Sequence, residues 1–251
     1  MLRNLKLVVS YDGSPYSGWQ VQPGRATIQC TLADAIERIT GERTMPQGSG
    51  RTDAGVHALA QVATFTTSSS IPSGNLVKAL NSVLPASIRA LAVEDVPEGF
   101  HARHSAKAKT YEYRLYRGDV CPPFLANFVT HHPYPLDESA MAEAAGRVVG
   151  EHDFTSFAAV DPEKGLAEEH ASNVRTIFSS DWRRNGDEFI YRVRGSGFLH
   201  HMVRNLVGTF LLVGKGTLKP SDLDDILAAR KRSAAGATAP AEGLYLVSVE
   251  Y

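Results

Sequence analysis

The segment best suited to chemistry is Gly48-Ser-Gly-Arg-Thr-Asp-Ala-Gly-Val-His57, in which an acid and a cation lie among three glycines. Glycines allow positive φ angles and a close approach of backbone, so we expect this loop to pass near another chain segment or a ligand. A tight turn stabilised by Asp53 is the commoner reason for Asp beside Gly, but a turn alone leaves Arg51 and His57 unexplained. Phosphate binding is disfavoured, because the chain has no Gly-x-x-x-x-Gly-Lys-Ser/Thr motif and Asp53 would repel a phosphate.

Two stretches of the chain are rich in basic residues. Phe100–Arg117 holds five cations and one acid, and Phe189–Ser221 holds five cations, two histidines and no acid. These cations are Arg103, Lys107, Lys109, Arg114, Arg117, Arg192, Arg194, Arg204, Lys215 and Lys219, and the rings interleaved with them are Tyr111, Tyr113, Tyr116, Tyr191 and Phe198. Charge runs are usually solvated faces, but cations beside stacking rings suit a strand of RNA. The pattern favours a local RNA-binding face.

Composition places the chain among ordinary globular proteins. Of its 251 residues, 43% are hydrophobic and 21% are charged, which argues against disorder. The formal net charge of −1 excludes a protein that holds nucleic acid by overall charge alone. Two cysteines are too few for a disulfide framework or a cysteine-rich zinc site. The N-terminal residues lack the apolar core of a signal peptide, and the apolar stretch Leu206–Val213 is too short to span a membrane, so we expect a soluble cytoplasmic protein.

Hydrophobic periodicity predicts strands that alternate with helices. The extended or alternating runs are Leu5–Tyr11, Gln61–Thr66, Ile88–Val93, Lys109–Arg117, Phe189–Arg194 and Leu244–Tyr251. The predicted helices are Thr27–Ile39, Asn75–Leu84, Leu136–Val149, Leu199–Val213 and Ser221–Ala229, with Thr27 and Ser221 as N-caps. Asn185-Gly186 predicts a hairpin turn before the fifth run. Because hairpins join some of the strands, this order suggests an α+β fold with an antiparallel sheet.

The chain shows a strand–helix–strand–helix order twice, although no exact repeat occurs. We therefore divide it into residues 1–105, which carry the Asp53 loop, and residues 106–251. Two related halves are plausible at this point, and the pattern of elements does not prove them.

A set of ordered motifs resembles one known family along the whole chain. Gly50-Arg-Thr-Asp-Ala-Gly-Val-His-Ala58 is similar to the active-site signature of the A-type tRNA pseudouridine synthases. The other matching motifs are Tyr11-Asp-Gly13, Ser17-Gly-Trp-Gln20, Thr27-Ile-Gln29, Phe100-His-Ala-Arg103, Lys109-Thr-Tyr-Glu-Tyr113, Gly150-Glu-His-Asp-Phe154, Val174-Arg-Thr-Ile177, Phe198-Leu-His-His-Met-Val-Arg-Asn205 and Gly243-Leu-Tyr-Leu246. Cys30 departs from the family, which more often has a small residue such as Gly there.

The resemblance implies a fold and an activity that composition and spacing do not supply. The implied fold has two ferredoxin-like halves that share a central antiparallel sheet with helices on one side, the pseudouridine synthase fold. The implied activity is the isomerisation of uridine to pseudouridine at positions 38, 39 and 40 of the tRNA anticodon stem-loop, by base flipping and an Asp-dependent rearrangement of the glycosidic bond. It also implies a homodimer, no cofactor and no metal. The shortness of the apolar stretches, and not the resemblance, is the reason to expect no membrane association.

The resemblance assigns roles to particular residues. Asp53 matches the catalytic aspartate, and a carboxylate that attacks ribose or uracil, or assists elimination, must stay charged in a closed pocket. Arg204 matches the basic residue placed against that aspartate. Tyr111 matches a tyrosine whose ring stacks on uracil and whose hydroxyl helps to remove the proton from carbon 5. Which atom Asp53 attacks stays open.

The remaining expected site residues bind the substrate. Arg51 is expected to fill the space that a flipped nucleotide leaves, because a base inside a stem must leave the stack to react. Leu244 is expected to line the pocket, and Arg103, Lys109 and Arg175 are expected to contact phosphates.

Two other functions are weighed against the isomerase. An RNA-binding module without chemistry is disfavoured because Asp53, Tyr111 and Arg204 are all present. A metal-assisted hydrolase would use Asp53 with histidines such as His57, His101, His200 and His201. These histidines are scattered, without a His-Glu-x-x-His pattern or cysteine support, so structural or RNA-contacting roles are favoured.

Overall fold

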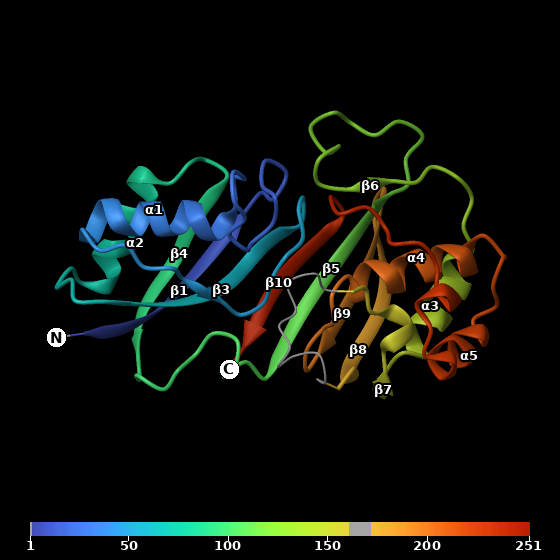
Figure 1. The fold of residues 1–251 in the computed structure, drawn as a ribbon. Helices are drawn as coiled ribbons and strands as arrows, with labels where there is room; N and C mark the ends of the chain where they lie inside the picture. Colours follow the sequence, from blue (N-terminus) through green and yellow to red (C-terminus); the bar gives the residue numbers. More distant parts are fainter. Residues whose placement is uncertain (1, 161–171) are drawn as a thin grey trace. The chain divides into compact units, whose positions relative to one another are not determined.

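The computed structural model describes residues 2–160 and 172–251, and the chain divides into two compact units. Unit 1 comprises Met1–Lys109 with Tyr245–Tyr251, and unit 2 comprises Thr110–Leu244 (Figure 1). The division expected from the sequence, 1–105 and 106–251, differs at both ends of its second part. Lys107 N donates to Glu250 O at 2.8 Å within unit 1, which ties both terminal segments of that part to this unit. That residues 1–105 and 106–251 are also two functional halves stays a prediction.

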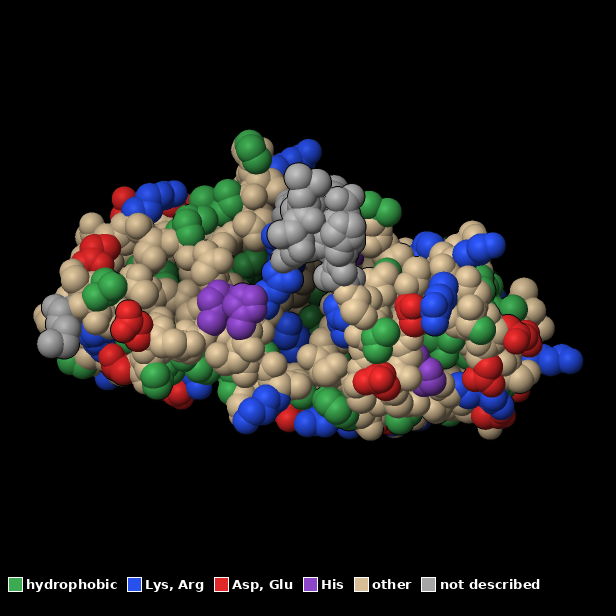
Figure 2. Space-filling model, turned by 60° about the horizontal axis from the view of Figure 1, so that its bottom comes forward, with side chains coloured by type: hydrophobic (Ala, Val, Ile, Leu, Met, Phe, Trp, Pro, Cys, Tyr) green, Lys and Arg blue, Asp and Glu red, His purple; other side chains and the backbone are tan. Residues whose placement is uncertain are grey.

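The surface carries charges of both signs (Figure 2), and the described helices are not of the membrane-spanning kind. Blue Lys and Arg side chains and red Asp and Glu side chains both occur on the face drawn in Figure 2, in keeping with the net charge of −1. Among the helices that the structure describes, none combines the length and the apolar character needed to cross a membrane.

Unit 1 is a complete βαββαβ motif. Its elements are β1 (Arg3–Tyr11), α1 (Ile28–Thr40), β2 (Gln47–Gly48), β3 (His57–Thr67), α2 (Ser73–Val83), β4 (Ile88–Val96) and, from the end of the chain, β10 (Leu244–Glu250). Strand β1 lies between β4 and β3, and the short β2 pairs with the other edge of β3, all antiparallel. This strand order is that of a ferredoxin-like fold. Strand β10 adds a parallel pairing to β3 through Tyr245 and Leu246.

Local sequence explains most of unit 1. Strand β1 buries alternate residues, including Leu5, Leu7 and Val9, because successive side chains of a strand point to opposite faces. Helix α1 starts where predicted, since the Thr27 hydroxyl accepts a hydrogen bond from Cys30 N at 3.4 Å. It ends at Gly41, whose φ of 76° closes the helix in the left-handed region. Helices α1 and α2 contact each other, and α2 packs on β4.

Among the described residues, unit 2 differs from unit 1 in having three strands, instead of two, between its first two α-helices. Its elements are β5 (Ala108–Tyr116), β6 (Thr130–His131), α3 (Glu138–Gly146), β7 (Gly150–Asp153), β8 (Val174–Asn185), β9 (Glu188–Gly195), α4 (Met202–Gly214) and α5 (Asp222–Ala229), with short 3-10 helices at Thr155–Phe157 and Arg232–Ala234. The strands follow the order β5-β9-β8-β7, and β6 pairs in parallel with β5. Helices α3 and α4 pack together, and α3 contacts β8. The α+β class is confirmed.

In unit 2 one predicted helix start was wrong, and one predicted N-cap residue makes no side-chain capping hydrogen bond. Helix α4 begins at Met202 rather than Leu199, because His201 takes a left-handed φ of 58° that a continuing helix does not allow. The side chain of Ser221 does not cap α5. Instead, the Asp222 carboxylate accepts a hydrogen bond from Lys219 N at 2.9 Å and so closes the entry to the helix. The predicted hairpin at Asn185-Gly186 is confirmed, with Asn185 opposite Glu188.

Candidate active site

The loop that carries Asp53 rests on two glycines far away in the sequence. Trp19 N donates to Thr52 O at 2.9 Å, and Gly18, with a φ of 89°, lies so close that a Cβ there would be 2.7 Å from Thr52 O. At Gly13 a Cβ would lie 2.0 Å from Val56 O. Side chains at either position would push the loop away. The motifs Tyr11-Asp-Gly13 and Ser17-Gly-Trp-Gln20 therefore support the Asp53 loop.

Asp53 begins a tight turn that is closed by main-chain atoms. Val56 N donates to the main-chain carbonyl of Asp53 at 3.1 Å, and Gly55 has a φ of 79°. The Asp53 side chain is half-buried, and Arg51, two residues earlier, is exposed. Because main-chain atoms of Val56 and Asp53 close the turn, the Asp53 carboxylate takes no part in that bond. Asp53 is thus suited to a chemical role as well as a structural one.

Buried polar side chains of Tyr11 and His57 form hydrogen bonds that support the loop. The Tyr11 hydroxyl lies 2.8 Å from Thr52 Oγ1, and burial raises the pKa of Tyr11 to about 12, so the phenol is neutral near pH 7. His57 Nδ1 accepts a hydrogen bond from Gly13 N at 3.1 Å, and its ring stacks on Tyr245 with centroids 4.8 Å apart. Because Nδ1 is an acceptor in this bond, its 3.3 Å contact with Asp12 is not an ion pair. A structural role for His57 follows.

A cation and an amide brace the first residues of the loop. Lys109 Nζ donates to Ser49 O at 2.5 Å, and a Cβ at Gly50 would lie 3.1 Å from that ammonium group. Gln61 accepts from the Ser49 hydroxyl at 2.6 Å and donates to Gly50 O at 3.0 Å. Lys109, expected to contact phosphate, is therefore a support of the Asp53 loop. Its contact with phosphate stays a prediction.

Arg103 lies on a separate turn of unit 1. His101 Nδ1 accepts from Arg103 N at 3.0 Å, and the Tyr251 hydroxyl donates to Ala102 O at 2.9 Å, which fixes the turn. Arg103 is exposed at its tip. Burial, His104 and Arg103 lower the pKa of His101, so that ring is neutral near pH 7. The turn presents a cation to solvent, as a phosphate contact requires.

In unit 2 the expected residues gather around the segment Gly195–His201. The ring of Tyr111, on β5, meets the ring of Phe198 edge-on with centroids 4.9 Å apart, and Tyr111 is buried. Arg175, at the start of β8, donates to Ser172 O at 2.7 Å and Val174 O at 2.6 Å. A Cβ at Gly197 would lie 3.5 Å from Arg175 Nε. Gly197 therefore lies at ordinary contact distance from Arg175, a proximity that the sequence did not indicate.

Arg204 is held by the chain segment that precedes β10. It lies half-buried in the first turn of α4, and its Nε donates to Ala239 O at 2.7 Å while Ala239 N donates to Arg204 O at 3.1 Å. Leu244 is buried at the start of β10, after a turn in which its N donates to Ala241 O at 2.9 Å. One partner of Arg204 is the main-chain carbonyl of Ala239, and no motif of side chains could have revealed this contact.

The structure corrects one expectation about the basic runs. Tyr113 and Tyr191 are buried, with their hydroxyls 2.7 Å from Thr130 Oγ1 and 2.8 Å from Ser180 Oγ, and burial raises the pKa of both phenols. Strand alternation turns their neighbours Glu112, Arg114 and Arg192 to the opposite face, where both guanidinium groups contact Glu112. The two tyrosines are core residues, and they do not form a stacking groove with these arginines.

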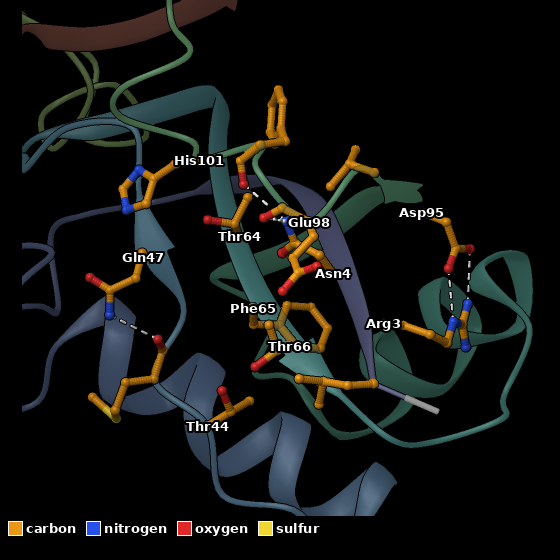
Figure 3. A pocket seen from close by; sticks show the side chains of 14 residues that line it. Arg3, Asn4, Thr44, Gln47, Thr64, Phe65, Thr66, Asp95, Glu98 and His101 are labelled. Carbon is orange, nitrogen blue, oxygen red and sulfur yellow. Dashed lines mark hydrogen bonds and ion pairs between the residues drawn. The ribbon is translucent and has the colours of Figure 1, made fainter.

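A pocket elsewhere in unit 1 is separate from this loop. It has a cavity volume of about 640 Å³ and lies beside β1 and β3, near the loop after β4 (Figure 3). Arg3 pairs with Asp95 at 2.8 Å, and Asn4 Nδ2 donates to Pro97 O at 3.0 Å. The described residues that line it do not include Arg51 or Asp53. These polar groups bind within the protein, so the pocket gives no sign of a ligand.

Comparison with known proteins covers nearly the entire chain. The family model described as tRNA pseudouridine synthase matches residues 7–105 and 144–251. The chain is 53% identical over 250 residues to the tRNA pseudouridine synthase A of Solibacter usitatus, with all of both chains covered. It is 42% identical over 250 residues to the protein of that name from Thermoanaerobacter sp. (strain X514), again over all of both chains. With the protein of that name from Bacillus pumilus the identity is 44%, over 98% of each chain.

Among solved structures, the archaeal box H/ACA sRNP Nop10–Cbf5 complex resembles the chain only distantly. The alignment covers 82% of this chain and 42% of that one, at 13% identity and a TM-score of 0.34. The family model and the full-length relatives, in contrast, name the same family, and it is the family that the motif around Asp53 resembles. This chain is a member of the tRNA pseudouridine synthase family.

Proposed function

We propose that the protein converts uridine to pseudouridine at positions 38, 39 and 40 of the tRNA anticodon stem-loop, as a homodimer in the cytoplasm. The observation that carries the proposal is the Asp53 loop. It has the motif Gly50-Arg-Thr-Asp-Ala-Gly-Val-His-Ala58, and Gly13 and Gly18 support its backbone. Family membership makes tRNA the substrate class, and the relatives are named for that activity.

The proposed reaction moves one bond of the nucleoside. The bond between ribose C1′ and uracil N1 breaks, a bond between C1′ and uracil C5 forms, C5 loses its proton and N1 gains one. The reaction is redox-neutral and needs no co-reactant. The Asp53 carboxylate, as nucleophile or as base for elimination, carries the glycosidic step. Arg204 is proposed to offset the cost of keeping that carboxylate charged in a site closed to water.

Tyr111 is proposed to act in the second half of the reaction. Its ring would stack on the freed uracil, and its hydroxyl would accept the C5 proton directly or through water. Support comes from the edge-to-face contact with Phe198, which restricts the orientation of the Tyr111 ring. The assignment of Asp53 and Tyr111 to one reaction rests on the family motifs that contain them, and Leu244 is proposed as an apolar contact for uracil.

The substrate must reach Asp53 as a flipped nucleotide. Removing a base from a stem costs a few kcal/mol. Arg51 is exposed two residues before Asp53, so it is proposed to fill the vacated place in the stem. Arg103, Lys109 and Arg175 are proposed to contact phosphates, with Arg103 the most accessible of the three.

The direct test is to map the modified positions. Unmodified tRNA labelled with tritium at C5 of uridine is incubated with the purified protein in a buffer containing a chelator. We expect release of tritium and pseudouridine at one or more of positions 38, 39 and 40. Binding without release would instead identify an RNA-binding module, and modification confined to another arm of the tRNA would reject the proposed target. Sedimentation of the protein alone at the mass of two chains would support the homodimer.

Replacing Arg51 with Ala is expected to impair the reaction on folded tRNA more than on unpaired RNA. Without the guanidinium group nothing fills the stem, and the cost of flipping lowers the rate by about 10- to 100-fold. On a short unpaired oligonucleotide the same variant is expected to lose about threefold or less. Single-turnover tritium release measures both rates.

Arg43→Ala is the control, because Arg43 is also an exposed arginine of unit 1, and its ion pairs are with Asp34 and Glu37 of α1. It should leave both rates unchanged. A loss of equal size on folded and unpaired RNA by Arg51→Ala would contradict the flipping role.

A further inference from the structure

The segment Arg232–Ala239, here called the strap, crosses α4 with its backbone in direct contact with the backbone of the helix. A Cβ at Gly208 would lie 1.7 Å from Ala237 O, and one at Gly236 would lie 2.6 Å from Gly208 O. Only glycines at both positions allow the strap to contact the helix backbone. Gly236 N also donates to Thr209 Oγ1 at 2.9 Å. The strap therefore lies directly on the helix that carries Arg204.

A buried amide fastens the strap. Asn205 is fully buried, and its Oδ1 accepts from Thr238 Oγ1 at 2.7 Å and from Arg232 Nη2 at 2.9 Å. Its Nδ2 donates to Phe157 O at 2.7 Å. Arg232 Nη2 also lies 3.2 Å from Thr238 Oγ1, so the Thr238 hydroxyl both donates and accepts. The bond to Phe157 O is buried and the bonds among Asn205, Thr238 and Arg232 are partly buried, so losing one partner is costly.

The strap ends on Arg204, and the residue after the strap contacts Tyr113 of β5. Ala239 exchanges two hydrogen bonds with Arg204, from Arg204 Nε to Ala239 O and from Ala239 N to Arg204 O. The next carbonyl, that of Pro240, accepts from the Tyr113 hydroxyl at 2.9 Å. Tyr113 lies on β5 on the same face as Tyr111. Two consecutive carbonyls thus connect the arginine of α4 with the strand of the proposed catalytic tyrosine.

We infer that Asn205 and Thr238 are positioning residues, which act through the strap to aim the Arg204 guanidinium. A guanidinium group is planar, so the bond from Nε to Ala239 O sets the direction of both Nη groups. If the Thr238 end of the strap loosens, Ala239 O moves and the plane of the guanidinium turns with it. This inference rests on the proposed role of Arg204 in the reaction.

The test compares Thr238→Val with Thr238→Ser. The valine has nearly the same shape but no hydroxyl, so we expect the single-turnover rate of tritium release to fall about 10- to 100-fold, because small displacements of reacting groups have effects of this size. The dissociation constant for tRNA should change by less than about twofold, since the strap orients a group and is not proposed to bind RNA. Thr238→Ser keeps the hydroxyl and is expected to restore the wild-type rate.

A matched control separates positioning from stability. Thr40 in unit 1 also has a hydroxyl that donates, to Ile36 O at 2.9 Å, and accepts, from Glu42 N at 3.2 Å. Thr40→Val should lower the melting temperature by a few degrees, as Thr238→Val does, without reducing the rate. Equal losses of rate in the two variants would show that lower stability explains the effect, and would overturn the inference.

The decisive measurement is a double-mutant cycle with Arg204→Lys. A lysine has no planar group for the strap to aim, so Thr238→Val should cost little further rate in that background. If the two substitutions are additive, the strap does not act through Arg204 and the inference fails. If Arg204→Lys alone keeps the full rate, the proposed role of Arg204 fails, and a loss caused by Thr238→Val must then have another origin.

Discussion

Asp53→Asn is expected to abolish pseudouridine formation while tRNA still binds with nearly unchanged affinity. An amide has almost the same shape as a carboxylate, but it is a much weaker nucleophile and base, so the rate of tritium release should fall by about 10³-fold or more. The tight turn should persist, because the bond that closes it runs from Val56 N to the main-chain carbonyl of Asp53, which the substitution keeps. Single-turnover release measures the rate, and fluorescence anisotropy with labelled tRNA measures binding.

Asp34→Asn is the control for this substitution. Asp34 is exposed on α1 and pairs with Arg43 at 3.0 Å, so its amide variant removes the same charge away from the Asp53 loop. It should retain the wild-type rate, since exposed ion pairs contribute little to stability. Substantial activity of the Asp53→Asn protein would remove Asp53 from the reaction. A large loss of tRNA binding would instead indicate that the carboxylate mainly organises the RNA-binding surface.

Gly13→Ala is expected to reduce both stability and activity, although the change is a single methyl group. The added Cβ would lie 2.0 Å from Val56 O, a backbone atom of the turn that Asp53 begins, so the two segments must separate. Overpacking of this kind costs about 1–3 kcal/mol in the free energy of unfolding. Because the displaced segment is the proposed active-site loop, the single-turnover rate should fall about 100-fold in molecules that remain folded. Urea unfolding and tritium release measure the two effects.

Gly74→Ala adds the same methyl group but is expected to raise stability and to leave the activity unchanged. Gly74 lies in the first turn of α2, and no atom is close to the position of its added Cβ. Alanine favours a helix over glycine, so the free energy of unfolding should rise by about 0.5 kcal/mol and the rate should not change. If Gly13→Ala were as stable and as active as the wild type, the close contact with Val56 would not be what supports the loop.

Much of the fold could be predicted because the deciding forces act between neighbours in sequence. The Thr27 cap, the alternation of Leu5, Leu7 and Val9, and the Asn185-Gly186 turn depend on side chains and backbone within a few residues. The motif around Asp53 is equally local, and it led to the family that the comparisons show. The roles of Asp53, Tyr111 and Arg204 stay predictions, because the motif names the residues without showing the reaction.

Some features were decided only when distant segments met. In the sequence Gly13 and Gly18 are ordinary turn residues. The structure shows that both must lack a side chain because the backbone of the Asp53 loop contacts them. Burial made Tyr113 and Tyr191 core residues, whereas the run of alternating aromatic and basic residues was equally compatible with an open groove.

The sequence by itself determined the local elements, the family and the candidate reactive side chains, because each depends on residue type and short spacing. The tertiary structure alone decided what holds those side chains in place. The carbonyls that hold Arg204 and Tyr113 belong to Ala239 and Pro240. Every residue has a carbonyl group, so residue type cannot indicate which one will be used. Only the path of the folded chain selects it, and that path depends on glycines small enough to let two backbones touch.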